Sequence, residues 1–183
     1  MPDVPNDAIC LFDLDGTLAD YDGAMRREFD KLTGVGGDAK GREALRRLIS
    51  HQPGFWRNLP PYKPGFNILR VARALGFECH VLTKGPRAYS PAWAEKLDWC
   101  RTHVPDLNIT ISQKKSLVYG KVLVDDWPGY YKPWLQVRPR GLVVVPAHAW
   151  NDGECDHPNI VRYDGTNTAE VRRRMIAAVE SAR

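Results

Sequence analysis

The chain has 183 residues, of which 43% are hydrophobic and 26% charged, and its formal net charge is +4. This length and composition suit one soluble α/β domain with room for a small appended cap. No apolar run approaches the roughly 20 residues of a membrane span, and the first seven residues lack a basic region and an apolar signal core, so we expect neither membrane insertion nor secretion. The modest positive charge favours an anionic substrate and does not indicate stable nucleic-acid binding.

The four cysteines, Cys10, Cys79, Cys100 and Cys155, contain no CxxC pair. Cys10 and Cys79 lie in predicted buried strands, which suits reduced thiols and leads us to expect a cytoplasmic protein. His148, Cys155 and His157 lack the paired spacing of zinc ligands, so no zinc site is expected from them.

The first predicted strand, residues 9–12, ends in two carboxylates one residue apart, Asp13 and Asp15, followed by Gly16 and Thr17. Asp13 should therefore lie at the strand's carboxyl end, the edge at which open α/β sheets bind ligands. Gly16 supplies a turn that lets the backbone curl around a bound group. Converging carboxylates require a cation or a proton between them, and an all-oxygen site suits Mg²⁺. The alternative is that Asp13 and Asp15 merely close the strand with a polar turn.

Two short helices are predicted next, at residues 24–32 and 39–50, with a glycine-rich break between them. In the second helix the apolar residues Ala44, Leu45, Leu48 and Ile49 are expected to face inward. We interpret residues 21–61 as a small helical cap over the catalytic edge, and residues 1–20 and 62–183 as the core.

From residue 64 onward, predicted helices and strands alternate. Helices are expected at 64–75, 91–103 and 168–181, and strands at 78–83, 107–112, 121–124, 142–145 and 160–163. This alternation predicts an α/β fold with a doubly wound parallel sheet and right-handed crossovers. In the helix at 91–103, Trp93, Leu97 and Cys100 form the expected apolar stripe.

Polar side chains end three of the predicted strands. Asp13 ends the first, Thr83 the second, and the pair Asp125–Asp126 the strand at 121–124. Parallel strands bring these residues to one edge of the sheet. Three tryptophans, Trp127, Trp134 and Trp150, are expected to be exposed and could serve a dimer interface or simply the core.

The order Asp-x-Asp, Thr, Lys, Asp-Asp resembles that of the haloacid-dehalogenase-like phosphatases. The resemblance implies that Asp13 is the nucleophile that forms an aspartyl-phosphate and that Asp15 is the general acid and base. It also implies Mg²⁺ bound by the Asp13 carboxylate, the Asp15 backbone carbonyl and one or both of Asp125 and Asp126. Thr83 would bind a phosphate oxygen and a lysine would neutralise charge.

The segments 55–60, 95–99 and 115–126 are similar to those of the 5'(3')-deoxyribonucleotidases, and this similarity covers roughly residues 9–151. It implies a magnesium-dependent phosphatase acting on nucleoside or deoxynucleoside monophosphates. By this match Lys115, rather than Lys114, is the catalytic lysine. Phe55 and Trp56 would line a nucleobase pocket, although both could equally pack the cap against the core.

One segment departs from the family pattern. The family tends to have Thr-Ser-Pro after its second strand, whereas this chain has Thr83-Lys84-Gly85-Pro86-Arg87. Lys84 is thus a further candidate to bind substrate, and the added cations leave substrate identity open. The alternatives are another small phosphoester, the 3'-phosphate of a polynucleotide, or a non-catalytic binding protein on the same fold. The sequence also leaves open the preferred base and sugar, 5' or 3' cleavage, and whether the chain forms a homodimer.

Overall fold

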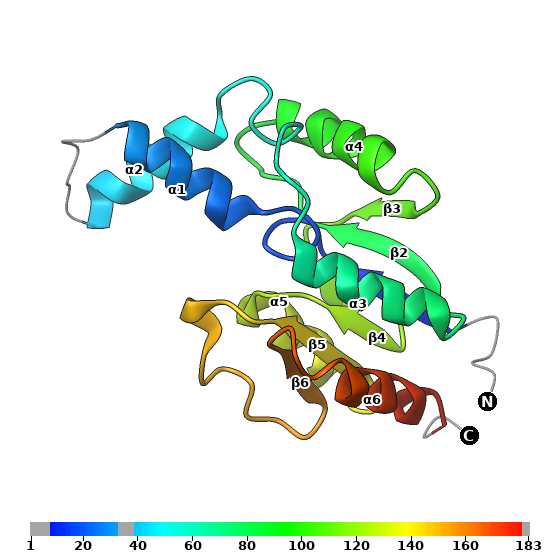
Figure 1. The fold of residues 1–183 in the computed structure, drawn as a ribbon. Helices are drawn as coiled ribbons and strands as arrows, with labels where there is room; N and C mark the ends of the chain where they lie inside the picture. The colour runs from blue at the N-terminus through cyan, green and yellow to red at the C-terminus, as the bar shows by residue number, and fades with distance from the viewer. Residues whose placement is uncertain (1–7, 33–38, 181–183) are drawn as a thin grey trace.

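The six strands of the computed structural model form one sheet in the order β3-β2-β1-β4-β5-β6 (Figure 1). The structure describes residues 8–32 and 39–180. All neighbouring strands are parallel, and the order changes direction between β1 and β4, where open α/β sheets bind ligands. The predicted doubly wound parallel sheet is therefore confirmed. The strands are β1 Ile9–Phe12, β2 Glu78–Thr83, β3 Asn108–Ile111, β4 Val122–Val124, β5 Leu142–Pro146 and β6 Ile160–Tyr163.

The strands consist of nearly continuous runs of apolar residues, as expected for parallel strands that are covered on both faces of the sheet. Every residue of β4 and β5 is buried. Phe12 of β1 aligns with Val81 of β2 and with Val124 of β4. Because these three residues are in register, the residues that follow β1 and β4 emerge side by side at the carboxyl edge of the sheet.

Helices cover both faces of the sheet. One core cluster joins alternate residues of β1, β2 and β4 to the helices α3 (Lys63–Ala74), α4 (Pro91–His103) and α6 (Thr168–Glu180). A second cluster joins the other residues of those strands and of β5 to α5 (Pro128–Gln136). Trp134 of α5 is fully buried there, so its predicted exposure is wrong, whereas Trp127 and Trp150 are exposed as predicted.

Two helices between β1 and α3 extend away from the sheet (Figure 1): α1 (Tyr21–Lys31) and α2 (Ala39–Ser50). They share a small core of Met25, Leu45 and Ile49. Ala44 and Leu48 face solvent instead of this core, because two helices pack along a narrow seam that only Leu45 and Ile49 reach. The first helix begins at Tyr21, earlier than predicted, because the Asp20 carboxylate accepts a hydrogen bond from the Gly23 N–H and caps it.

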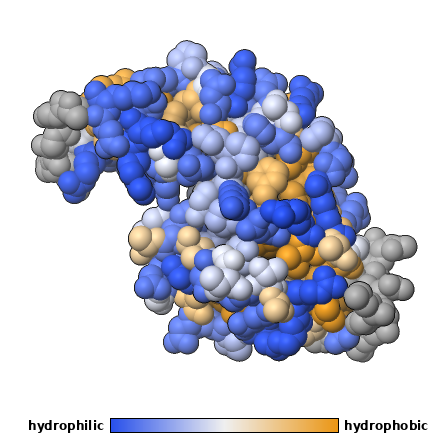
Figure 2. Space-filling view, in the orientation of Figure 1, coloured by the Kyte–Doolittle hydropathy of each residue, from blue (hydrophilic) through white to orange (hydrophobic). Residues whose placement is uncertain are grey.

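The two chain segments that connect α1 and α2 to the rest of the molecule run side by side. The Asp20 N–H donates to the Pro60 carbonyl and the Tyr62 N–H donates to the Leu18 carbonyl, both at 2.7 Å. In the space-filling view a notch separates the helical pair from the body of the molecule, whose surface is mostly hydrophilic (Figure 2). This arrangement is compatible with a cap at residues 21–61, which remains a prediction. Within the described residues, no helix is long and apolar enough to cross a membrane.

Candidate active site

The loop after β1 places Asp13 at the carboxyl edge of the sheet. Asp13 is buried, and its N–H donates to the Val124 carbonyl of β4 at 2.8 Å. The chain then makes a single helical turn in which the Leu18 N–H donates to the Leu14 carbonyl at 2.9 Å. Gly16 has φ +75°, and a Cβ there would lie 2.1 Å from the Asp126 Oδ2 atom. Glycine is therefore required both for the turn and for the close approach of the two loops.

Three buried carboxylates meet at this edge. Asp13, Asp125 and Asp126 each offer an oxygen, and these oxygens lie within 4.8 Å of one another. Burial raises the pKa of Asp125, which Lys115 opposes only in part. Burial together with the charges of Asp125 and Asp13 raises the pKa of Asp126 well above its usual range. A buried all-oxygen set that resists ionisation is a suitable donor set for a hard divalent cation such as Mg²⁺.

Lys115 lies between two of these carboxylates. Its Nζ atom is 2.7 Å from an oxygen of Asp13 and 2.7 Å from an oxygen of Asp125. Burial by itself would lower the pKa of the Lys115 ammonium, but the two carboxylates outweigh burial and raise this pKa. The neighbouring Lys114 is exposed. The structure thus brings Lys115, and not Lys114, to the acidic cluster.

A second buried lysine, which our sequence analysis did not single out, contacts Asp15. Lys96 of α4 is 1% exposed, and its ammonium donates to Asp15 Oδ2, to the Thr83 hydroxyl at 3.2 Å and to the Lys84 carbonyl at 2.8 Å. Burial raises the pKa of Asp15, while Lys96 opposes the rise. The other carboxylate oxygen of Asp15 has no hydrogen-bond partner within the described part of the chain.

The spacing of the buried residues in α4 is a sequence pattern from which Lys96 could have been identified as a site residue. The buried stripe of α4 consists of Ala92, Glu95, Lys96, Trp99 and Cys100, spaced as the core face of a helix. The predicted stripe was wrong for Trp93 and Leu97, which are only half-buried. Two charged residues on a core face need buried partners, and such a pattern indicates a polar site rather than a solvated helix.

Glu95 is the second charged residue of that stripe. Its carboxylate accepts hydrogen bonds from the Gly54 N–H at 2.7 Å and from the Trp56 N–H at 3.1 Å. These bonds fix the segment after α2 against α4. Trp56 is held there with its ring 4.6 Å from the Lys96 ammonium.

A cavity of about 800 Å³ opens in front of these carboxylates. Asp13, Asp15, Trp56 and Lys84 line it together with other residues, whereas Phe55 does not. Phe55 packs edge-on against Trp56, with ring centroids 5.4 Å apart, and faces a different hollow. Of the two expected base-pocket residues, the structure thus brings only Trp56 to the cavity. The cavity lining also includes four aromatic residues that the sequence did not indicate as part of the site: Tyr21, Trp127, Tyr130 and Trp150.

Thr83 and Lys84 end β2 beside this cavity. Thr83 is fully buried and its hydroxyl accepts the bond from Lys96. The Lys84 ammonium donates to the Tyr130 hydroxyl at 3.2 Å and lies 4.9 Å from the Tyr130 ring centroid. The Lys115 ammonium lies 4.8 Å from the centroid of the same ring, so both lysines contact Tyr130.

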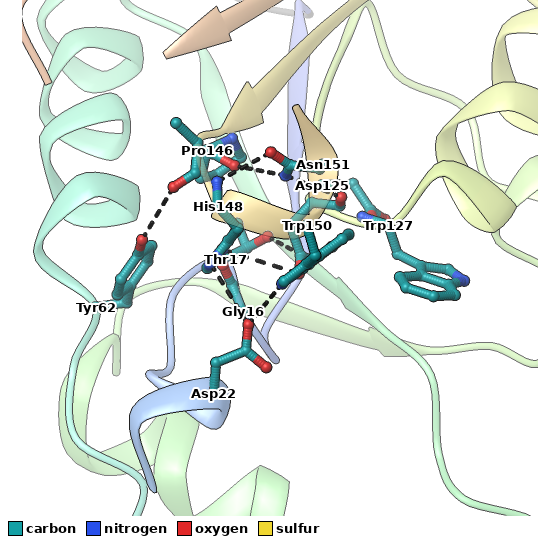
Figure 3. A network of polar contacts seen from close by, with 12 residues as sticks. Gly16, Thr17, Asp22, Tyr62, Asp125, Trp127, Pro146, His148, Trp150 and Asn151 are labelled. Carbon is teal, nitrogen blue, oxygen red and sulfur yellow. Dashed lines mark hydrogen bonds and ion pairs between the residues drawn. The ribbon is translucent and has the colours of Figure 1, made fainter. Parts of the chain in front are cut away.

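His148, which follows β5, connects the loop after β1 to helix α1 (Figure 3). Its Nε2 atom is 2.7 Å from the Gly16 carbonyl, and its Nδ1 atom is 3.5 Å from an Asp22 carboxylate oxygen. The Trp150 indole N–H donates to the same Asp22 oxygen at 2.7 Å. His148 does not join Cys155 and His157: within the described residues, the group that could hold a metal is Asp13, Asp125 and Asp126.

The fold and the acidic edge define the class of protein. A haloacid dehalogenase-like family hydrolase from Xanthomonas campestris is similar to this chain with a TM-score of 0.59 and 14% sequence identity, over 95% of this chain and 98% of that one. The chain thus has the fold of the haloacid-dehalogenase-like hydrolases.

Sequence comparison narrows the class to one family. The profile of the family described as "5' nucleotidase, deoxy (Pyrimidine), cytosolic type C protein" matches residues 37–143, more than half of the chain, and the chain belongs to this family. Asp13 and Asp15 precede the matched stretch, while Thr83, Lys115 and Asp125–Asp126 lie within it.

Curated relatives agree with the family. Proteins named "Putative 5'(3')-deoxyribonucleotidase" from Bordetella bronchiseptica and Bordetella pertussis are each 25% identical to the chain over 173 residues, which covers 83% of this chain and 90% of theirs. The chain is a phosphomonoester hydrolase of the 5'-nucleotidase-like type, and the alternative of a non-catalytic protein is not supported.

Proposed function

We propose that this chain hydrolyses nucleoside and deoxynucleoside monophosphates in a Mg²⁺-dependent reaction that passes through an aspartyl-phosphate on Asp13. The observation that carries the proposal is the position of Asp13. It lies buried at the end of β1, one of its oxygens contacts Lys115, and it faces a cavity with an aromatic wall. A carboxylate so oriented by a lysine is suited to act as a nucleophile.

In the first step an Asp13 oxygen attacks phosphorus while the bond from phosphorus to the ester oxygen breaks. Asp15 donates its proton to that departing oxygen. Burial raises the pKa of Asp15, which favours a proton on this carboxyl, and its oxygen without a partner is available to the substrate. In the second step Asp15 removes a proton from water, which attacks phosphorus and releases phosphate from Asp13.

Three cations would stabilise the charge on the transferring phosphoryl group. Lys115 contacts the nucleophile, and Lys96 lies under Asp15 and Thr83. Lys84 lines the cavity beside them. Thr83 would contribute to the phosphate site through its hydroxyl, in agreement with its position at the end of β2.

Asp13, Asp125 and Asp126 would hold Mg²⁺, with the Asp15 backbone carbonyl as a further ligand. The set of buried, mutually repelling oxygens supports this assignment. When bound, the ion would supply positive charge to the nucleophile and the phosphate oxygens. Gly16 would contribute by allowing the Asp126 carboxylate to approach the first loop.

The nucleotide part of the proposal rests on Trp56 and Tyr21. Their rings stack 5.5 Å apart with an interplanar angle of 21° on the cap side of the cavity. Trp56 is buried and supports the partly exposed Tyr21 ring from behind, and the Tyr21 ring is the aromatic surface that suits a nucleobase. The family and the names of the Bordetella relatives support the same substrate class. Cytoplasmic location and homodimer formation remain predictions.

The test is phosphate release from 5'- and 3'-mononucleotides, sugar phosphates and a 3'-phosphorylated oligonucleotide, each with Mg²⁺, with EDTA and with Asp13→Asn. We expect turnover on mononucleotides that EDTA abolishes and that Asp13→Asn reduces by at least about 1,000-fold, because the nucleophile is lost. Turnover confined to sugar phosphates would support the phosphatase reaction but contradict the assignment of nucleotides as substrates. Full activity of Asp13→Asn would contradict the mechanism.

A further inference from the structure

Two half-exposed tryptophans line the cavity on the side of the sheet. Trp127 follows the metal-site carboxylate Asp126 and is 50% exposed, and Trp150 in the loop after β5 is 41% exposed. Their ring centroids are 5.2 Å apart, with an interplanar angle of 53°. Large aromatic residues are usually mostly buried. An exposed pair that adjoins a catalytic cavity is a candidate ligand surface.

The chain positions the Trp150 ring through a hydrogen bond and a ring stack, and the Trp127 ring packs against Trp150. Trp150 donates its indole N–H to Asp22 and stacks on His148 at 5.3 Å, and His148 in turn stacks on Tyr62 at 5.1 Å (Figure 3). The Trp127 backbone N–H donates to an Asp125 oxygen at 2.9 Å. The surface therefore exists before any ligand binds, which lowers the entropic cost of binding.

This surface is additional to the one formed by Tyr21 and Trp56. Those two rings belong to the cap side and contact each other, whereas Trp127 and Trp150 belong to the loops after β4 and β5. The cavity volume of about 800 Å³ is in the upper part of the range of roughly 300–1,000 Å³ found for small-molecule sites. Trp56 is buried behind Tyr21, so a nucleobase on the cap side would contact the partly exposed Tyr21 ring and leave the second surface free.

Cations without carboxylate partners complete the site. Arg46, Lys84 and Arg87 line the cavity. Lys84 and Arg87 bond to neutral side chains, Tyr130 and Gln113, and across residues 8–32 and 39–180 none of the three forms an ion pair. Aromatic surfaces combined with free cations are how proteins bind single-stranded nucleic acid.

We propose that Trp127 and Trp150 bind the base next to the terminal nucleotide, so that the chain removes the terminal phosphate from short single-stranded oligonucleotides. Arg46 and Arg87 would face the phosphodiester between the two nucleotides, because Lys84 is assigned to the transferring phosphoryl group. The inference rests on the proposed function and uses the same chemistry. The bond from phosphorus to the terminal sugar oxygen breaks, that oxygen receives the proton of Asp15, and the phosphoryl group passes to Asp13 and then to water.

The test compares kcat/KM for a 5'-phosphorylated mononucleotide, the matching dinucleotide, and a dinucleotide whose second sugar carries no base; a 3'-phosphorylated series is run in parallel. In the wild type, removal of the second base should lower kcat/KM by about 10-fold, a typical effect of one lost stacking contact. Trp127→Ala should lower the ratio of dinucleotide to mononucleotide kcat/KM by a similar factor, and Trp127→Phe should restore much of it.

The decisive quantity is the coupling between the two changes. Trp127→Ala and removal of the second base should together cost little more than either alone, because both remove the same contact. Tyr119→Ala is the matched control, since Tyr119 is an exposed aromatic residue that does not line the cavity. It should leave the ratio as in the wild type.

Equal loss on mononucleotide and dinucleotide in Trp127→Ala would overturn the inference, as would additive effects of the two changes. Mononucleotide turnover without dinucleotide turnover would overturn this inference alone and leave the proposed function standing. A changed elution volume of Trp127→Ala in size-exclusion chromatography, without a changed ratio, would assign the surface to a second copy of the chain instead. Absence of turnover on both substrates would overturn both proposals.

Discussion

At the scale of single residues, two buried lysines balance part of the negative charge of the site carboxylates. Lys115 lies between Asp13 and Asp125, and Lys96 contacts Asp15. Each lysine compensates the negative charge of the carboxylates that it contacts, and so lowers the cost of burying them. Asp13, the proposed nucleophile, and Asp15, the proposed general acid, thus have separate cationic partners, which would keep two adjacent carboxylates in different roles.

The first prediction concerns Lys96. We expect Lys96→Met to lower kcat by about 100-fold, because Asp15 would lose its orienting partner and proton transfer in the transition state would be less efficient. The measurement is steady-state phosphate release at saturating substrate, with the fold verified by circular dichroism. Lys114→Met is the control, since Lys114 is an exposed lysine near the same site. A kcat of Lys96→Met within about twofold of the wild type would argue against a role for this lysine.

The second prediction concerns Gly16. Gly16→Ala would introduce strain at φ +75° and a clash with Asp126, whereas Gly153→Ala would introduce similar strain at φ +80° with no atom within 4 Å. The left-handed conformation costs each variant roughly 1–2 kcal/mol. Only Gly16→Ala should also raise the Mg²⁺ concentration needed for half-maximal activity, by about 10-fold or more. Equal magnesium dependence in the two variants would exclude the contact as the cause.

At the scale of elements, helix α4 acts as a support for both sides of the cavity. Lys96 reaches the loop after β1, and Glu95 reaches the segment after α2. Adjacent residues of one helix therefore position both Asp15, the proposed general acid, and the aromatic wall. The fixed geometry of α4 couples the two sides, because a shift of this helix would move both.

The third prediction follows from this coupling. Glu95→Ala would leave the N–H groups of Gly54 and Trp56 without their acceptor, at a cost of about 1–3 kcal/mol in the free energy of unfolding. Because Trp56 would no longer be held against α4, we expect KM for nucleotides to rise by about 10-fold with a smaller change in kcat.

Glu95→Gln retains an acceptor oxygen and should recover part of the KM effect. Ribose 5-phosphate, which has no base, provides the control substrate, since its KM should hardly respond to either variant. A parallel rise in KM for the sugar phosphate and the nucleotide would indicate general distortion of the site instead.

At the scale of the whole molecule, ionisation of the buried carboxyl groups at the acidic edge destabilises the metal-free fold. Burial raises the pKa of Asp125 to about 7, and burial with the neighbouring carboxylates raises the pKa of Asp126 well above its usual range. The folded state then binds more protons than the unfolded chain. The contribution of these groups to stability is complete below about pH 4 and is lost as the pH rises through the folded-state values.

The fourth prediction is that the melting temperature in EDTA falls as the pH is raised from about 4 to about 7, and that Mg²⁺ largely removes this fall by neutralising the cluster. Differential scanning calorimetry at several pH values, with and without Mg²⁺, measures it. Asp126→Asn should show a shallower fall in EDTA and a smaller gain from Mg²⁺. The same pH profile in the variant and the wild type would rule out the cluster as its source.

The sequence by itself determined most of the fold. The strands ending at Phe12, Thr83 and Val124 were predictable because continuous apolar runs bounded by polar turns have few other solutions. Their order along the chain also determined which polar residues lie at the carboxyl edge, because parallel strands all end there. That rule places Asp13, Asp125 and Asp126 at the same edge, and the pairing of β1 with β4 then brings them together.

Only the tertiary structure decided which side chains cross between elements. Lys96, Glu95 and His148 act on partners more than 35 residues away, and no local pattern specifies such partners. The inward or outward position of Leu48, Trp134 and Phe55 likewise depends on what packs against them. Periodicity reports which residues share a face of a helix, but the element that meets this face is set by the packing of the whole chain.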